Sequence, residues 1–294
     1  MKLKLIPVII GICLCIFIVL GIKTLNRYVD QHFNFENNLI PADYDLSVES
    51  HTIDYKGGTI AGWYINHINP KALIILTHGY TINGYGGKSL MLPHAKYLFD
   101  AGYSVFLWDI PGFGESSGDS ITLGITEWKS AAKVYEYVRH LQNNLSLSIG
   151  FMGISMGATT IINTVGITNK GDFIIAVVPY ATLTSLATQI LHSTFPELKY
   201  VPFFVDIIFK LKFGFDYANY LPQITIENIS VPILIMYAEN DSIVNPQDAK
   251  ELYAKAHSPK EVWSIASNHF IYYAYPNEFS QTVLDFLSKY INNE

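Results

Sequence analysis

Six short runs of apolar residues most constrain the fold of this 294-residue chain. They are residues 72–77 (ALIILT), 103–109 (YSVFLWD), 145–152 (LSLSIGFM), 172–178 (DFIIAVV), 231–237 (VPILIMY) and 261–266 (EVWSIA). Continuous apolar runs of this length are typical of strands buried on both faces of a parallel sheet. Helix-compatible segments alternate with them, at residues 87–102, 126–142, 155–166, 246–257 and 276–291. The alternation predicts an α/β fold with a mostly parallel, doubly wound sheet.

Two segments depart from this alternation. Residues 45–55 and 59–68 are joined by Lys-Gly-Gly, which predicts an antiparallel β-hairpin. Further along, more than 50 residues rich in Phe, Tyr, Leu and Ile separate the runs at 172–178 and 231–237. A connection this long favours a partly helical cap insertion, at about 181–228, over the carboxyl edge of the sheet, where α/β folds bind ligands. The alternative is an extra helical layer with no role in binding.

The N-terminus contains 18 residues, 5–22, without a charged or strongly polar side chain. As a helix they would reach roughly 27 Å, close to the hydrocarbon thickness of a bilayer. A buried core helix would be expected to carry a polar stripe, and a cleaved signal peptide would be followed by small residues. The run carries no polar stripe, and it continues as GIKTLNRYV, with bulky and charged residues in place of a cleavage site. The sequence therefore favours an uncleaved transmembrane anchor with its flanks at 1–30, a polar connector at 31–44 and one domain at 45–294.

The flanking charges give little information about orientation. Lys2 and Lys4 before the apolar run are balanced by Lys23 and Arg27 after it, so the positive-inside rule does not choose a side. We expect an extracytoplasmic domain. Both cysteines of the chain lie in the apolar run, so the domain can form no internal disulfide, which fits either side of a membrane.

The remainder of the chain is acidic. Residues 31–294 contain 15 Lys and Arg against 24 Asp and Glu, a formal net charge of −9 with His neutral. No basic stripe interrupts this acidity. Because nucleic-acid binding depends on neutralising phosphates with Lys and Arg, nucleic acid is excluded as the ligand.

Two pentapeptides fit Gly-x-Ser-x-Gly, the pattern of a nucleophilic serine on a strand-to-helix turn: GESSG at 114–118 and GISMG at 153–157. Such a turn needs a strand directly before the serine and a helix directly after it. GISMG follows an apolar run and opens a helix-compatible segment. GESSG is separated from its strand by a Pro-Gly turn and is followed by DSITLG, which is not helical. We therefore expect Ser155 to be the nucleophile, and Ser116 and Ser117 to belong to a loop.

A serine nucleophile needs a base and an acid that orients the base, and on this fold they follow in the order Ser, Asp or Glu, His. Asp241 follows the run at 231–237, and His269 follows the run at 261–266. Carboxyl ends of parallel strands share one edge of a sheet, so both residues are expected beside Ser155. The alternatives are Glu239 or Asp248 as the acid, and His257, His192 or His140 as the base.

The oxyanion of the tetrahedral intermediate also needs donors. His78-Gly79-Tyr80 ends the first parallel strand, and Gly residues at 84, 86 and 87 let the following segment turn sharply. The backbone N–H of Tyr80, paired with that of Met156 after the nucleophile, would bind the oxyanion. An ordinary turn between a strand and a helix is the alternative.

In these motifs the chain resembles the α/β-hydrolase superfamily, over roughly residues 45–290. The resemblance rests on HGY (78–80), DIPGFGESSG (109–118), GISMG (153–157), AENDSIVNP (238–246) and SNHF (267–270). It implies Ser155 as nucleophile, His269 as base, Asp241 as its orienting acid, and the Tyr80 and Met156 amides as the oxyanion hole. It also implies that the 109–118 loop borders the site. Related proteins often carry Arg in this loop, where this chain has Ile110-Pro111, so a role for such a charge does not carry over.

Together these features predict a capped serine hydrolase that cleaves an ester, thioester or amide through an acyl-enzyme on Ser155. The aromatic, apolar cap favours a small-molecule substrate with a hydrophobic acyl group, and hence an activity like that of a carboxylesterase or lipase. No metal or organic cofactor is expected. The alternatives are a membrane-anchored hydrolase similar to serine peptidases, for which we identify no charge that would hold a peptide terminus, and a catalytically silent binding module.

Overall fold

The computed structural model describes residues 39–80, 87–118, 121–142, 146–194, 207, 209–212, 221–257 and 259–291. Within these ranges no helix is both long enough and apolar enough to cross a membrane. The anchor predicted at residues 5–22 lies outside the described residues. Residues 41–44 of the predicted connector form a short 3-10 helix, η2 (Pro41–Tyr44), and Tyr44 packs against the core of the domain.

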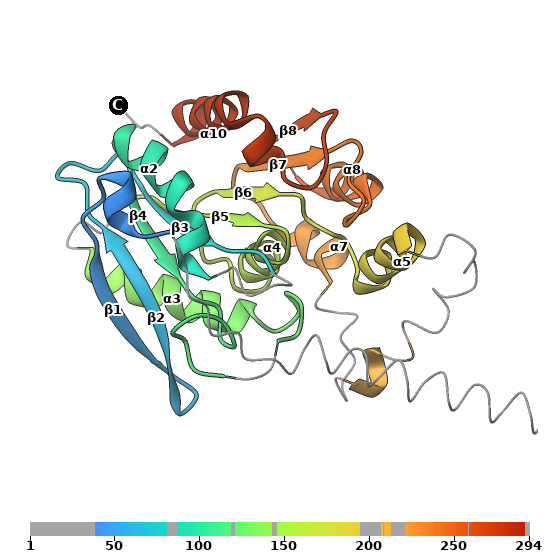
Figure 1. The fold of residues 1–294 in the computed structure, drawn as a ribbon, viewed down its shortest axis with the longest axis horizontal. Coiled ribbons are helices and arrows are strands. Elements are labelled where there is room, and N and C mark those ends of the chain that lie inside the picture. The colour runs from blue at the N-terminus through green and yellow to red at the C-terminus, as the bar shows by residue number, and fades with distance from the viewer. Residues whose placement is uncertain are drawn as a thin grey trace, which may run out of the picture.

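An eight-stranded sheet lies at the centre of the molecule, in the order β1-β2-β4-β3-β5-β6-β7-β8 (Figure 1). Its strands are β1 (Glu49–Tyr55), β2 (Gly58–Ile65), β3 (Leu73–Thr77), β4 (Ser104–Trp108), β5 (Ile149–Ile154), β6 (Ile174–Val177), β7 (Ile233–Ala238) and β8 (Lys260–Ile265). β2 pairs antiparallel with β1 and with β4, and all the other pairs are parallel. The predicted parallel sheet is confirmed, and the predicted hairpin is β1 and β2.

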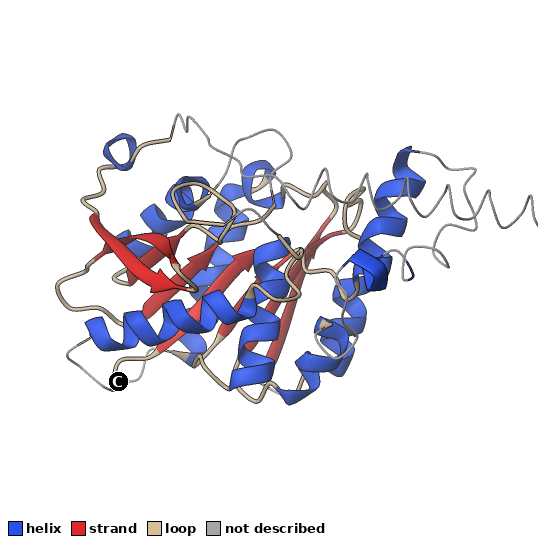
Figure 2. Ribbon diagram, turned by 90° about the horizontal axis from the view of Figure 1, so that it is seen from below, coloured by secondary structure: helices blue, strands red, loops and turns tan. Residues whose placement is uncertain are grey.

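Helices cover both faces of the sheet, so that the strands lie between two helical layers (Figure 2). α2 (Leu92–Asp100) and α10 (Pro276–Tyr290) cover one face, and α3 (Trp128–Leu141), α4 (Met156–Thr168) and α8 (Pro246–Lys255) cover the other. A hydrophobic core lies on each face of the sheet, and successive side chains of a strand point alternately into the two cores. In β3, Ile74 and Leu76 pack toward α2 and α10, whereas Leu73 and Ile75 pack toward α3, α4 and α8. This is the period of two expected for strands buried on both faces.

The last strand differs from its prediction. The run at 261–266 is expected to be buried on both faces, yet no residue of β8 is fully buried and Val262 is 43% exposed. The reason is topological, because β8 is the edge of the sheet and has one neighbouring strand, β7. An apolar run alone does not distinguish an edge strand from a central one.

The long connection between β6 and β7 contains α5 (Leu183–Thr194), α7 (Pro222–Thr225) and η5 (Ile226–Asn228). α5 lies beyond the carboxyl ends of β5 and β6 (Figure 1). A small third core, which includes Leu183, Leu186 and Phe209, joins this connection to Val244 of the segment after β7. Residues 195–206 and 213–220 of the predicted cap lie outside the described residues, so a lid function remains a prediction.

Candidate active site

Ser155 lies on a sharp turn between β5, which ends at Ile154, and α4, which begins at Met156. Its backbone has φ 54° and ψ −114°, a conformation that residues with a Cβ rarely adopt. The turn is held on both sides, since Ser155 N–H donates to the Val177 carbonyl of β6 (2.8 Å) and Thr159 N–H donates to the Ser155 carbonyl (3.0 Å). The arrangement is a sharp strand-to-helix elbow, which lifts a half-buried serine above the sheet edge.

The two glycines of the elbow are required by close backbone approaches. A Cβ on Gly157 would lie 2.2 Å from the Thr77 carbonyl oxygen, and a Cβ on Gly153 would lie 2.5 Å from the Gly157 carbonyl oxygen. Both separations are shorter than any real Cβ contact. The first turn of α4 therefore packs directly on the end of β3 only because position 157 has no side chain.

Asp241 and His269 form a buried pair beyond β7 and β8. His269 Nδ1 donates to Asp241 Oδ2 at 2.6 Å, and the two residues are 6% and 5% exposed, His269 first. The other carboxylate oxygen, Oδ1, accepts the N–H groups of Ile243 (2.8 Å) and Val244 (2.9 Å). With Nδ1 occupied as a donor, a neutral His269 has its Nε2 available as an acceptor, the tautomer that a general base requires.

The other candidate acids are committed elsewhere. The Glu239 carboxylate is exposed and accepts a hydrogen bond from Ser264 Oγ on β8 at 2.9 Å. Asp248 accepts from Ala181 N–H (3.1 Å) and Ser185 Oγ (2.6 Å), at the start of the cap insertion. Burial raises the pKa of Asp248, against the effect of these two hydrogen bonds. Of the alternative bases, His140 and His257 are exposed on the surface.

The two predicted oxyanion donors belong to the elbow and to the chain that runs beside it. Met156 is the first residue of α4, so its N–H has no acceptor within the helix. On the other side, a Cβ on Gly79 would lie 3.0 Å from the Ile154 carbonyl oxygen and 3.4 Å from Ser155 Cβ. The chain leading into Tyr80 therefore runs directly against the elbow. Residues 81–86, which follow, lie outside the described residues.

His78, next to Gly79, links the end of β3 to the 109–118 loop. Its Nδ1 donates to the Gly79 carbonyl (2.8 Å), and its Nε2 accepts the N–H of Ile110 (3.0 Å), which together define a neutral tautomer. Burial lowers the pKa of His78, and the charge of Lys88 lowers it further, although Asp109 acts in the opposite direction. The ring is thus a neutral connector between two loops.

The second serine of the matching pentapeptides, Ser116, is structural. It is 1% exposed, its Oγ donates to the Asp109 carbonyl (2.6 Å), and it accepts the N–H of Ala61 (2.9 Å). Its neighbour Ser117 accepts the N–H of Thr59 at 3.0 Å. GESSG thus joins the 109–118 loop to β2, as a loop and not as an elbow.

A buried ion pair in this loop is not expected from the sequence. Lys88 Nζ, from η3 (Lys88–Met91), lies 2.6 Å from Asp109 Oδ2, and the side chains are 5% and 2% exposed. The same ammonium contacts Glu115 at 2.5 Å and lies 4.6 Å from the ring centre of Trp63. The missed signal is Asp109 itself, an acidic residue at the end of an otherwise apolar run.

The long connection between β6 and β7 contacts, through α5, the loop that carries Asp241. Gln189 Nε2 donates to the Asp241 carbonyl oxygen at 3.1 Å. The next residue, Ile190, is 42% exposed, and Phe270, which directly follows His269, is 47% exposed. The rings of His269 and Phe270 are 5.5 Å apart. An exposed aromatic side chain, Phe270, thus adjoins the Asp241–His269 pair.

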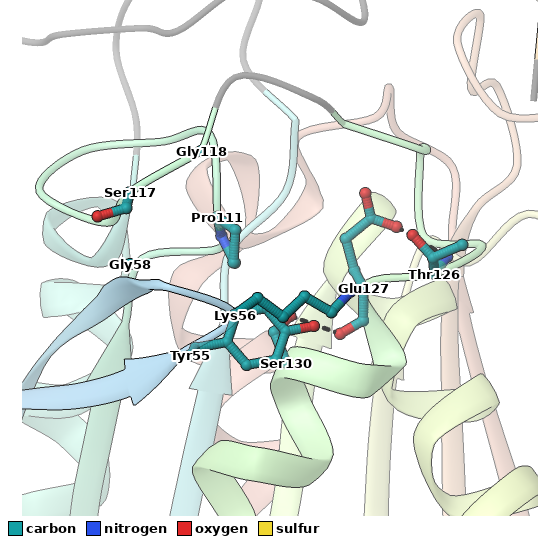
Figure 3. A pocket seen from close by; sticks show the side chains of 9 residues that line it. All are labelled: Tyr55, Lys56, Gly58, Pro111, Ser117, Gly118, Thr126, Glu127 and Ser130. Atoms are coloured by element: carbon teal, nitrogen blue, oxygen red, sulfur yellow. Dashed lines mark hydrogen bonds between the residues drawn. The ribbon is translucent and has the colours of Figure 1, made fainter.

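A separate cavity of about 210 Å³ lies between the turn of the β1–β2 hairpin, the 109–118 loop and the start of α3 (Figure 3). Its lining includes Lys56, Ser117 and Glu127, and none of the three predicted catalytic residues. The Glu127 carboxylate is already occupied, because it accepts hydrogen bonds from the backbone N–H and the hydroxyl of Thr122. This cavity is thus separate from the predicted catalytic site.

Comparison with known proteins agrees with the observed fold. Residues 68–213 match the family model described as serine aminopeptidase, S33. The chain is 28% identical to the Bacillus subtilis protein YqkD over 241 residues, covering 79% of this chain and 76% of that one. It is 27% identical to the Salmonella typhimurium protein YfhR over 281 residues, covering 93% and 91%.

Two further similarities concern proteins with a named activity. The chain is 27% identical to the zebrafish (Danio rerio) lysophosphatidylserine lipase ABHD12 over 211 residues, covering 69% of this chain and 52% of that protein. Among solved structures, the Pyrococcus furiosus esterase Pf2001 superposes with a TM-score of 0.74 at 20% identity, covering 90% and 98%. Together, the sheet order, the family model over residues 68–213 and these similarities show that the chain has the α/β-hydrolase fold.

Proposed function

We propose that the protein is a serine hydrolase that forms an acyl-enzyme on Ser155. The observation that carries the proposal is the buried Asp241–His269 hydrogen bond of 2.6 Å, together with Ser155 at a positive φ on a strand-to-helix elbow. A strained backbone at a serine on such an elbow, and a buried histidine oriented by a carboxylate, are both typical of catalytic sites.

In the proposed reaction, Ser155 Oγ attacks the acyl carbon while its proton passes to His269 Nε2. The tetrahedral oxyanion is bound by the N–H groups of Tyr80 and Met156. As the bond to the leaving group breaks, His269 returns the proton to the departing oxygen, sulfur or nitrogen. Water then attacks the acyl-enzyme by the same route, which regenerates Ser155 and releases the acid. Asp241 keeps His269 in the required tautomer throughout.

The substrate we propose is an ester with a hydrophobic acyl group. Support comes from the exposed Phe270, whose ring lies 5.5 Å from that of His269, since apolar surface at a site favours an apolar ligand. The esterase and lipase names of two similar proteins point in the same direction. The family model is named for an aminopeptidase, so an amide is the competing substrate class.

An activity-based probe tests the mechanism. A fluorophosphonate should label the wild-type chain and the Ser116→Ala variant, and labelling should disappear in Ser155→Ala. Absence of labelling in well-folded wild-type protein would instead indicate the silent binding module. A series of p-nitrophenyl esters of increasing chain length, measured beside aminoacyl anilides, then separates the substrate classes. Faster hydrolysis of the anilides would overturn the ester proposal.

We further propose that residues 5–22 anchor the chain in a membrane with the catalytic domain on the extracytoplasmic side. The apolar length of this segment supports the anchor. The full-length chain should remain in the membrane pellet after carbonate extraction, with an intact N-terminus by mass spectrometry. Orientation can be tested with Ile68→Cys, at a position that is 88% exposed, and a membrane-impermeant maleimide. Labelling only after cell lysis would place the domain on the opposite side.

A further inference from the structure

The chain between His78 and Lys88 carries Tyr80, and both of its ends are attached to the same loop, residues 109–118. At the first end, the His78 ring bridges the Gly79 carbonyl and the N–H of Ile110, with distances of 2.8 and 3.0 Å. At the second end, the backbone N–H of Lys88 donates to Asp109 Oδ1 at 2.6 Å. Gly79, which precedes the proposed oxyanion donor, and Lys88 are therefore both tied to this loop.

The second attachment is charged and enclosed. Lys88 Nζ donates to Asp109 Oδ2 (2.6 Å), and the same oxygen accepts the N–H of Glu115 at 3.0 Å. The carboxylate of Asp109 thus binds both the main chain and the side chain of Lys88, and also the main chain of its own loop. Hydrogen bonds to a charged group are shorter and stronger than neutral ones, and they fix geometry accordingly.

Two glycines provide the space for this carboxylate. A Cβ on Gly87 would lie 2.3 Å from Asp109 Oδ1, and a Cβ on Gly114 would lie 2.5 Å from Asp109 Oδ2. Both glycines have positive φ, 87° and 51°. The chain therefore wraps closely around Asp109 from the side of Lys88 and from the side of the 109–118 loop. A side chain at either glycine would displace the carboxylate from these contacts.

A buried ion pair is a poor source of stability, because the loss of hydration of the two charges offsets most of their attraction. Its benefit is more often a fixed arrangement. Here the pair fixes the start of the 109–118 loop, where the N–H of Ile110 holds His78 and His78 holds Gly79. Gly79 lies beside the elbow, since a Cβ at this position would lie 3.0 Å from the Ile154 carbonyl oxygen. Lys88, which lies outside the 109–118 loop, also brings a positive charge to it. Ile110 and Pro111 of that loop carry none.

We propose that the Asp109–Lys88 pair is a positioning device for the oxyanion hole, which sets the Tyr80 N–H opposite the Met156 N–H. The proposal rests on the proposed serine-hydrolase function. Neither residue is one of the predicted reacting groups. The pair acts on Tyr80 through the next residue of the loop, Ile110, whose N–H holds the His78 ring, and through the bond from that ring to the Gly79 carbonyl.

The test is Asp109→Asn and Lys88→Met, measured on the full chain with the active sites counted by fluorophosphonate labelling to completion. We expect kcat per labelled site to fall about 10- to 100-fold, with KM nearly unchanged, since a displaced oxyanion donor weakens transition-state binding alone. A trifluoromethyl ketone, which forms the tetrahedral adduct, should bind more weakly by a similar factor. Lys88→Arg, which keeps the charge, should recover part of kcat.

Matched controls are Asp100→Asn and Lys96→Met, because Lys96 and Asp100 form an exposed ion pair on α2 with an N–O distance of 2.7 Å. These variants should keep wild-type kcat per labelled site. The double variant Asp109→Asn/Lys88→Met removes both buried charges, so it should recover folded yield without recovering kcat. If the single variants lose labelled sites but keep kcat per site, the pair is merely structural and the proposal is overturned. Failure of the wild-type chain to label would instead refute the hydrolase function itself.

Discussion

Two pentapeptides of this chain share the pattern Gly-x-Ser-x-Gly, and their serines lie in opposite environments. Ser155 is half-buried on a turn with positive φ, directly between a strand and a helix. Ser116 is 1% exposed, and its hydroxyl is fully engaged by the backbone of Asp109 and Ala61. The first arrangement presents a hydroxyl above the sheet edge, and the second uses a hydroxyl to fasten a loop.

Their glycines differ in the same way. In 153–157 they allow backbone to approach backbone, since Gly157 packs on the carbonyls of Thr77 and His78. In 114–118, Gly114 makes room for the carboxylate of Asp109, and Gly118 adopts a φ of 121°, where a Cβ would lie 3.2 Å from the backbone nitrogen of Gly112. The comparison teaches that a short pattern acquires its meaning from the elements on either side of it.

The largest expected effect separates the two serines. Ser155→Ala should reduce kcat about 10⁶-fold without loss of fold, because it removes the proposed nucleophile. Ser116→Ala should cost about 1–3 kcal/mol of stability, because it leaves a buried carbonyl and a buried N–H without their partner, and should keep most of the turnover per labelled site. Ester hydrolysis with active-site counting, beside urea unfolding, measures both. Equal losses of turnover would remove the distinction between the two pentapeptides.

The next effect tests which acid serves the elbow serine. Asp241→Asn should lower kcat about 10⁴-fold with the fold intact, because an amide favours the wrong tautomer of His269. Glu239→Gln is the control, two positions away and hydrogen-bonded to Ser264 on the surface. If Glu239→Gln is the more damaging change, the acid has been assigned to the wrong residue.

The glycines should respond unequally to a methyl group. Gly157→Ala should cost about 3 kcal/mol or more and abolish activity, because its Cβ would lie 2.2 Å from the Thr77 carbonyl oxygen, within rigid backbone. Gly118→Ala should cost about 1–3 kcal/mol through its positive φ, with the elbow unchanged. Thermal unfolding and turnover per labelled site compare them. Full activity in Gly157→Ala would show that the first turn of α4 can move away from β3.

The last prediction concerns the stability of the fold at low pH. Behind the elbow, His94 of α2 is buried among Tyr97, Tyr272 and Phe279, and its Nδ1 has no hydrogen-bond partner among the described residues. Tyr97 in turn contacts Met152 of β5, the strand that leads into the elbow. Burial lowers the pKa of His94 from 6.5 to about 4.

Because the unfolded chain binds the proton more readily, stability should be complete above pH 6.5 and should fall by up to about 3 kcal/mol as the pH drops to about 4. His94→Leu should flatten this part of the profile of unfolding free energy against pH. His140→Leu, at an exposed histidine of α3, is the matched control. An unchanged slope in His94→Leu would show that another group is responsible.

Much of the molecule could be predicted from local sequence. The runs at 72–77 and 103–109 contain β3 and β4, because continuous apolar side chains can only be satisfied between two helical layers. The proximity of Asp241 to His269 could be predicted, because both residues follow neighbouring parallel strands and emerge at the same edge of the sheet. The exposure of β8 could not be predicted, since the neighbours of a strand depend on topology and not on its own residues.

The Lys88–Asp109 pair could not be predicted for a related reason. The two residues are 21 positions apart, on segments that follow different strands, and neither has a local pattern that names its partner. Their contact depends on β3 and β4 being adjacent and parallel, which aligns their carboxyl ends. Side-chain pairs formed across loops follow from the assembled sheet and are visible only after it.

The backbone of Ser155 has a consequence for how such a sequence can change. A φ of 54° suits glycine better than any residue with a Cβ, so a chain selected for thermal stability alone would exchange this serine for glycine. Leu123 and Val178 also have a positive φ, so the angle alone does not mark a functional residue. Ser155→Gly, which relieves the angle and removes the hydroxyl, should therefore gain stability while it loses the proposed chemistry.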